Sequence, residues 1–177
     1  MKSPEQQTFV TPRLIVRPRE LSDLEACRQM DMDPEVHRFV PGPWHDRVEH
    51  ERFLTSRLSA DYGPNLGYWS VVRKEEPLDF LGWVFLTRMA EGNGLEMGWR
   101  FVKSAWGGGV ATEAARPVLE HTSLAYPTSP ILAFIAPENI GSKRVAEKLG
   151  LRATGAVQDG EHVYASERSG ETFEDCA

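Results

Sequence analysis

Alternation of apolar and polar residues predicts a series of short strands along this chain. Segment 9–17 centres on Leu14, Ile15 and Val16 and stops at Pro18, because proline lacks the N–H that a strand ladder needs. Segments 67–73 and 80–88 flank a charged turn, which is typical of an antiparallel hairpin, and 95–102 extends the same sheet. Further on, 131–136 is predicted as a strand and 152–167 as one or two strands around Asp159 and Gly160.

The spacing of apolar residues predicts two helices between the first strand and the hairpin. In the first, Ser22 is the expected N-cap and Glu25, three residues later, completes a capping box. A more polar helix is predicted over 47–60. Prolines and a glycine keep the loop 41–46 irregular, so its Trp44 is either a loop anchor or part of a binding pocket.

A glycine loop leads from strand 95–102 into a third helix, and this is the most informative feature of the chain. Its sequence is Trp106-Gly107-Gly108-Gly109-Val110-Ala111-Thr112. A strand, a glycine turn and a helix N-terminus in this order direct free backbone N–H groups at one spot, which favours phosphate oxygens. Pro117 lies inside the predicted helix and predicts a kink or a local break there.

A fourth helix is predicted over 140–149, with Asn139 as its N-cap and Gly150 at its end.

Composition narrows the class of protein. The 177 residues predict a single domain, 1–177, with an ordered core at roughly 8–168. The net charge of −6 argues against a nucleic-acid surface and suits a cationic amine. We expect a cytoplasmic protein without a membrane partner, since no apolar run reaches membrane-spanning length and the start lacks a signal-peptide core. Cys27 and Cys176 form no metal or disulfide motif, and the histidines, expected on the surface, show no metal-ligand spacing, so no metal site is predicted.

Several of these motifs together resemble the GNAT superfamily of N-acetyltransferases, in particular the bacterial ribosomal-protein N-terminal (alanine/serine) acetyltransferase branch. The matching segments, which follow the family's order across nearly the whole chain, are Thr11-Pro12-Arg13-Leu14-Ile15-Val16-Arg17, Glu96-Met97-Gly98-Trp99-Arg100, the glycine loop, and Asn139-Ile140-Gly141-Ser142 with the helix that follows. A glycine loop alone is a weak signal, whereas the loop combined with the Asn-x-x-Ser helix is specific. Gly108 departs from the pattern, because the family often has a basic residue there.

The resemblance implies an α+β fold with a mixed, mostly antiparallel twisted sheet, helices on both faces and a splayed central pair of strands. It also implies acetyl-CoA as cosubstrate and direct attack by an amine, without an acetyl-enzyme intermediate. The implied cofactor-binding residues are Phe101 and Val102 through their backbone, the loop residues Trp106, Gly107, Gly108, Gly109, Val110, Ala111 and Thr112, and Asn139, Ser142 and Arg144.

Glu96 is the best candidate for a base, because the reaction needs a neutral amine and primary amines are protonated at neutral pH. An ion-paired or solvated strand carboxylate is an equally good interpretation of Glu96. Ser142 is a candidate to protonate the departing thiolate, or simply to bind the cofactor. A backbone N–H near Phe101 is placed to stabilise the oxyanion on the acetyl carbonyl.

Two functional classes remain open at this stage. The first is an N-acetyltransferase acting on the primary amine of a small molecule or peptide, in a chain for which the resemblance makes a homodimer plausible. The second is a non-catalytic acyl-CoA-binding or regulatory module on the same fold, for which Gly108 leaves room. A dinucleotide-binding Rossmann domain is excluded, because antiparallel strands precede the glycine loop.

Overall fold

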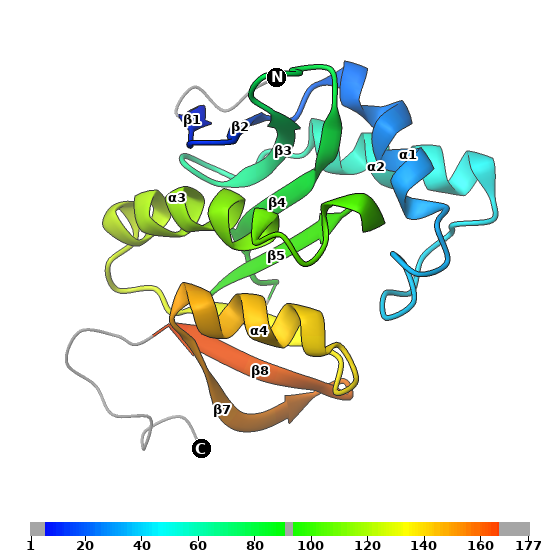
Figure 1. The fold of residues 1–177 in the computed structure, drawn as a ribbon. Coiled ribbons are helices and arrows are strands. Elements are labelled where there is room, and N and C mark those ends of the chain that lie inside the picture. Colours follow the sequence, from blue (N-terminus) through cyan, green and yellow to red (C-terminus); the bar gives the residue numbers. More distant parts are fainter. Residues whose placement is uncertain (1–5, 91–93, 167–177) are drawn as a thin grey trace.

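The computed structural model describes residues 6–90 and 94–166, and within them eight strands form one open sheet (Figure 1). The strands are β1 (Phe9–Val10), β2 (Leu14–Pro18), β3 (Gly67–Arg73), β4 (Phe80–Arg88), β5 (Leu95–Phe101), β6 (Ile131–Ile135), β7 (Leu151–Gln158) and β8 (Glu161–Ser166). Their spatial order is β1-β2-β3-β4-β5-β6-β8-β7. The β5–β6 contact is parallel and the others are antiparallel, which confirms the predicted mixed sheet.

Helices cover both faces of this sheet. The elements are the 3-10 turn η1 (Leu21–Asp23), α1 (Leu24–Asp31), α2 (Arg47–Ser59), the 3-10 turn η2 (Lys103–Ala105), α3 (Val110–Ala125) and α4 (Ile140–Leu149). In Figure 1, α3 and α4 lie in front of the sheet, and α1 and α2 lie together on its other side. Two hydrophobic clusters correspond to these two layers: a large one contains α3 and α4, and a smaller one contains α1 and α2.

The alternation of side chains along β5 determines which layer each residue meets. Leu95, Met97 and Phe101 belong to the large cluster under α3. Residues of the other parity point toward α1 and α2, because successive strand side chains lie on opposite faces. Gly98 packs there so tightly against Phe85 that a Cβ would lie 2.3 Å from the ring.

Strands β5 and β6 part almost as soon as they meet. Their register consists of two pairs, Leu95 with Ile131 and Glu96 with Leu132, although both strands continue for several residues. The central pair is therefore splayed, as the family resemblance implied. The carboxyl-terminal part of β5 is left with one backbone edge that faces no strand.

Some details of the predicted elements need correction. The first predicted strand is divided into β1 and β2, because a turn at Thr11, whose N–H donates to the Leu14 carbonyl, interrupts it. Glu20, rather than Ser22, is the N-cap of the first helical segment, in a capping box with Asp23. The predicted local break at Pro117 is wrong, because α3 is helical from Val110 to Ala125.

Proline in that position removes one backbone hydrogen bond, and the buried apolar side of α3 holds the helix together around it. No helix in the described part of the chain is long and apolar enough to cross a membrane.

Candidate active site

A cavity of about 580 Å³ lies where the carboxyl end of β5, the glycine loop and the N-termini of α3 and α4 meet. Ten of the residues predicted to bind a cofactor line it: Phe101, Trp106, Gly107, Gly109, Val110, Ala111, Thr112, Asn139, Ser142 and Arg144. The loop segment 35–40, which follows α1, forms a further wall. The structure therefore brings these ten predicted residues together around one cavity, and it adds the wall at 35–40.

The N-terminus of α3 presents unpaired donors to this cavity. Its N-cap is Gly109, whose φ of 77° is left-handed, and no side chain in the described residues caps the helix. Helices α2 and α4 differ, since Asp46 and Asn139 accept hydrogen bonds from backbone N–H groups of their first turns. The first N–H groups of α3 are thus left for an anion, and the helix dipole favours one there.

An ion pair behind the glycine loop holds the loop at Gly108. Arg13 Nη2 donates to the Gly108 carbonyl at 2.9 Å, and Arg13 Nε donates to Glu113 Oε2 at 2.7 Å. Glu113 also accepts from the Thr11 hydroxyl at 2.7 Å. Gly108 itself does not line the cavity, so the loop is held in place from the outside by the segment before β2.

These partners were not predicted as site residues, because about a hundred positions separate Arg13 from the loop. The only signal for them is that the Thr11–Arg17 segment is one of the motifs that carry the resemblance.

The backbone register corrects one predicted cofactor contact. Val102 donates its N–H to the Leu81 carbonyl at 2.9 Å, and its own carbonyl accepts from Ala105 at 3.0 Å. Because backbone groups alternate in direction along a strand, Trp99 and Phe101 direct theirs to the opposite edge, toward the gap beside β6. Val102 therefore does not line the cavity, whereas Trp99 does.

Trp106 connects the glycine loop to this strand. Its indole Nε1 donates to the Phe101 carbonyl at 2.9 Å, while the side chain remains 47% exposed. The Phe101 carbonyl is therefore engaged, and its N–H is the backbone group left facing the gap.

The α4 side of the cavity is organised by its cap. Asn139 Oδ1 accepts from the Ser142 backbone N–H at 3.0 Å, which confirms the predicted N-cap. Ser142 and Arg144 both line the cavity. The capping bond leaves the Asn139 side-chain NH₂ as the group that can contact a ligand.

Glu96 lies apart from this lining, on the α1/α2 face of β5. It is half-buried. Burial and the nearby Glu161 carboxylate raise the pKa of Glu96, and the Arg57 guanidinium partly lowers it again. No ion pair of Glu96 is present in the described residues, so the ion-paired interpretation is not supported there. A carboxyl with a raised pKa is suited to accept a proton at neutral pH.

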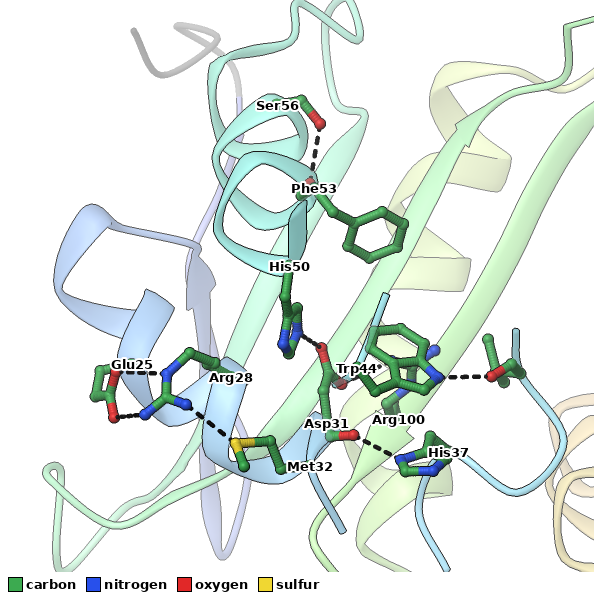
Figure 2. A network of polar contacts seen from close by, with 11 residues as sticks. Glu25, Arg28, Asp31, Met32, His37, Trp44, His50, Phe53, Ser56 and Arg100 are labelled. Carbon is green, nitrogen blue, oxygen red and sulfur yellow. Dashed lines mark hydrogen bonds and ion pairs between the residues drawn. The ribbon is translucent and has the colours of Figure 1, made fainter. Parts of the chain in front are cut away.

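Trp44 is a loop anchor rather than a pocket residue. It is 5% exposed, donates from Nε1 to the Val40 carbonyl at 2.9 Å and stacks on His37. Figure 2 shows it beside a buried network in which Asp31 joins His50 and Arg100. The surface position expected for His50 is wrong, because this ring is 1% exposed and bonded to Asp31.

The described residues contain no group of three or more His, Cys, Asp or Glu that would hold a metal ion. Cys27 is fully buried, and this burial raises the pKa of its thiol to about 11. Cys27 is therefore not an activated nucleophile. The other cysteine, Cys176, lies outside the described residues.

The family model described as "Acetyltransferase (GNAT) domain" matches residues 13–152. The chain belongs to the GNAT acetyltransferase family. In sequence, it is 28% identical over 147 residues to a Bacillus subtilis (strain 168) protein named "Uncharacterized N-acetyltransferase YnaD", covering 83% of this chain and 84% of that one. These findings identify the chain as an acetyltransferase.

Two solved GNAT structures share the fold at low sequence identity. The ribosomal-protein-S5-alanine acetyltransferase of Vibrio fischeri superposes with a TM-score of 0.71 at 16% identity, covering 94% of this chain and 100% of that one. Mycobacterium smegmatis RimJ, solved in complex with CoA-disulfide, gives a TM-score of 0.67 at 19% identity, covering 90% and 85%. Both likenesses concern the fold.

Proposed function

We propose that this GNAT protein transfers an acetyl group from acetyl-CoA to a primary amine by direct attack. The observation that carries the proposal is that one cavity joins the uncapped N-terminus of α3 to the free backbone edge of β5. An anion site and an unpaired strand edge side by side suit a long ligand that has a pyrophosphate at one end and amide groups along its arm.

The residues of the cavity divide the work of binding. Gly107, Gly109 and the first turn of α3 would hold the pyrophosphate through their N–H groups, and Arg144 adds a cation beside them. Trp99 would pair with the pantetheine amides through its backbone groups, and Asn139 would contact the same arm. Acetyl-CoA, when bound, supplies an activated thioester carbonyl.

Three groups would serve the chemistry. Glu96 removes a proton from the amine, directly or through a water, as its half-buried position and raised pKa allow. The Phe101 N–H donates to the carbonyl oxygen as negative charge develops on it. The Ser142 hydroxyl would return a proton to the thiolate sulfur, a role supported by its position in the cavity wall at the start of α4.

Direct transfer fits the one cysteine that the structure describes. An acetyl-enzyme intermediate needs an activated nucleophile, and the buried Cys27 is not one. The acceptor in this proposal is the amine of a protein N-terminus or of a small molecule, and the acidic net charge of −6 favours approach of a cation.

The test combines binding and turnover. Acetyl-CoA is expected to raise the melting temperature of the protein, and free CoA is expected to appear when a panel of peptides, polyamines and aminosugars is supplied. Stabilisation by acetyl-CoA without CoA release from any amine would instead establish the non-catalytic acyl-CoA-binding module. A melting temperature unchanged by acetyl-CoA would contradict both functions.

A further inference from the structure

Arg100 is a buried cation that the proposed chemistry does not use. It lies on β5 four residues after Glu96, so both side chains point to the α1/α2 face. The Arg100 side chain is 9% exposed, yet Arg100 is one of the residues that line the cavity. A nine-tenths buried guanidinium at the wall of a binding cavity needs a physical explanation.

Within the described residues, the protein uses only part of the hydrogen-bonding capacity of the Arg100 guanidinium. Its Nη1 donates to Asp31 Oδ1 at 2.6 Å, and the indole rings of Trp44 and Trp83 lie 4.8 and 5.0 Å from its central carbon. Among the residues that the structure describes, Nε and Nη2 have no hydrogen-bond partner. Neither nitrogen is among the fully buried side-chain atoms that lack a partner in the described residues, so both are accessible and can donate to an oxygen-bearing ligand.

Asp31 holds Arg100 in one orientation. Its Oδ2 is 3.1 Å from His50 Nε2 on α2, and its backbone carbonyl oxygen is 2.8 Å from His37 Nδ1 in the loop (Figure 2). His50 of α2 thereby fixes the carboxylate, and His37 of the loop fixes the backbone of the same residue. The ion pair with this fixed carboxylate restricts the Arg100 side chain, so the guanidinium nitrogens without a hydrogen-bond partner cannot easily rotate away from the cavity.

The wall beside Arg100 is the part of the cavity that the cofactor does not need. Val36 and Val40 line it, and the Trp44 ring that covers Arg100 donates to the Val40 carbonyl. The glycine loop, Asn139 and Ser142 lie on the other side, at the N-termini of α3 and α4. The geometry therefore assigns the Arg100 side to the acceptor.

We propose that Arg100 recognises the acceptor by donating to a carbonyl or carboxylate oxygen on the carbon next to the reacting amine, with Asp31 as its positioning residue. This inference rests on the proposed function and narrows its acceptors to α-aminoacyl compounds. Simple alkylamines and polyamines carry no such oxygen. A free amino acid and a peptide N-terminus share this chemistry and are separated below.

The experiment compares alaninamide with 2-aminopropane, which is the same amine without the carbonyl group. Arg100→Lys keeps a cation for Asp31 and removes the planar fork, so the ratio of kcat/KM for alaninamide to that for 2-aminopropane is expected to fall about tenfold. The comparison between variants cancels the different basicities of the two amines. Arg52→Lys, at an exposed position on α2, is the matched control and should keep the wild-type ratio.

Further measurements separate the possible roles. An equal loss for both amines would show a merely structural role for Arg100, and a raised Kd for CoA would show a cofactor contact; either result overturns the inference. Asp31→Asn should lower the same ratio in the same direction. Alanine and a short peptide beginning with alanine identify the source of the oxygen: faster turnover of the peptide indicates a protein N-terminus, and of alanine a free amino acid.

Failure of the proposed function is distinguishable from failure of this inference. Turnover of 2-aminopropane as efficient as that of alaninamide in both the wild type and Arg100→Lys would leave the N-acetyltransferase intact and overturn the role of Arg100. Absence of CoA release from every amine would overturn the proposed function. In that case, alaninamide should still raise the melting temperature of the CoA-loaded wild type and not of Arg100→Lys, and equal shifts would overturn the inference as well.

Discussion

At the scale of single residues, the balance between burial and charge decides what Glu96 can do. Desolvation and the neighbouring Glu161 both raise the pKa of Glu96, and Arg57 lowers it. The sequence identified Glu96 through its motif, but an alternating strand pattern carries no information on the charge that surrounds it. Glu161, which is sixty-five positions away in the chain, meets it only because β8 joins the sheet beside β6.

Replacing Glu96 by Gln is expected to lower kcat by about a hundredfold, because a general base contributes on that order. The wild-type rate should rise as pH increases through the pKa of Glu96, which lies above the ordinary value of 4.5. The variant should lose this rise, which forms the acid limb of the pH profile. Measured kcat/KM between pH 4 and pH 9 checks both. Undiminished turnover of the variant across this range would contradict the role of base.

The same substitution has an opposite effect on stability. A pKa raised by folding means that the stability contributed by protonated Glu96 is complete below the unfolded pKa and is lost as pH rises through the folded pKa. The Gln variant should therefore melt at a higher temperature than the wild type at pH 7, with the difference vanishing at low pH. Glu161→Gln is the companion variant: it should lower the pKa of Glu96 and move the acid limb of the activity toward lower pH.

At the scale of elements, the glycine loop shows how a helix N-terminus is kept open. Gly107 and Gly109 have φ values of 76° and 77°, in the left-handed region where a side chain is strained, while a Cβ at Gly108 would meet nothing within 4 Å. Three consecutive glycines look equivalent in the sequence. The structure separates them into two that the backbone requires and one that it does not.

Gly109→Ala is expected to lower the free energy of unfolding by about 1 kcal/mol and to raise the Kd for acetyl-CoA, because the loop must leave its left-handed conformation. Gly108→Ala is the matched control and should change neither quantity, since its Cβ has open space. Urea unfolding and calorimetric titration with acetyl-CoA measure the pair. Equal affinities of the two variants would contradict the assignment of the loop to the pyrophosphate.

Prediction from sequence succeeded where local rules act alone. Strands β3 and β4 and helix α4 have the predicted bounds, because turns, Asn139 and Gly150 mark their ends in the sequence itself. The first helical segment was misplaced by two residues, since Glu20 and Ser22 are both followed by an acidic residue at the third position and only the packed structure selects between them. The wall at 35–40 was not predicted, because that irregular segment owes its position to tertiary contacts such as the Lys103 bond to Glu35.

At the scale of the whole molecule, a polar network rather than apolar packing alone joins the α1/α2 layer to the sheet. Asp31 at the end of α1 bonds to His50 on α2 and to Arg100 on β5, and both Asp31 and His50 are 1% exposed. No periodic pattern connects positions 31, 50 and 100. A buried network of this kind is visible only after the chain has folded.

Asp31→Asn is expected to lower the free energy of unfolding by about 3 kcal/mol, because it leaves the buried Arg100 without its counter-ion. Asp79→Asn breaks an ion pair with Arg73 that is 40% exposed on the aspartate side, so about 0.5 kcal/mol or less is expected. Urea unfolding at neutral pH compares the two variants. Equal losses would show that burial of the Asp31 pair does not distinguish it from a surface pair.

The short junction between β5 and β6 divides the sheet into two leaves, β1 to β5 and β6-β8-β7, which share two pairs of residues. Elsewhere the leaves are joined through the packing of α3 against α4. A ligand bound in the gap would contact both leaves and stabilise the junction between them. Without the ligand, the leaf that carries β7 and β8 would open more readily. Under the proposed function, the supply of acetyl-CoA would in this way set how cooperatively the two leaves unfold and how long the chain stays folded.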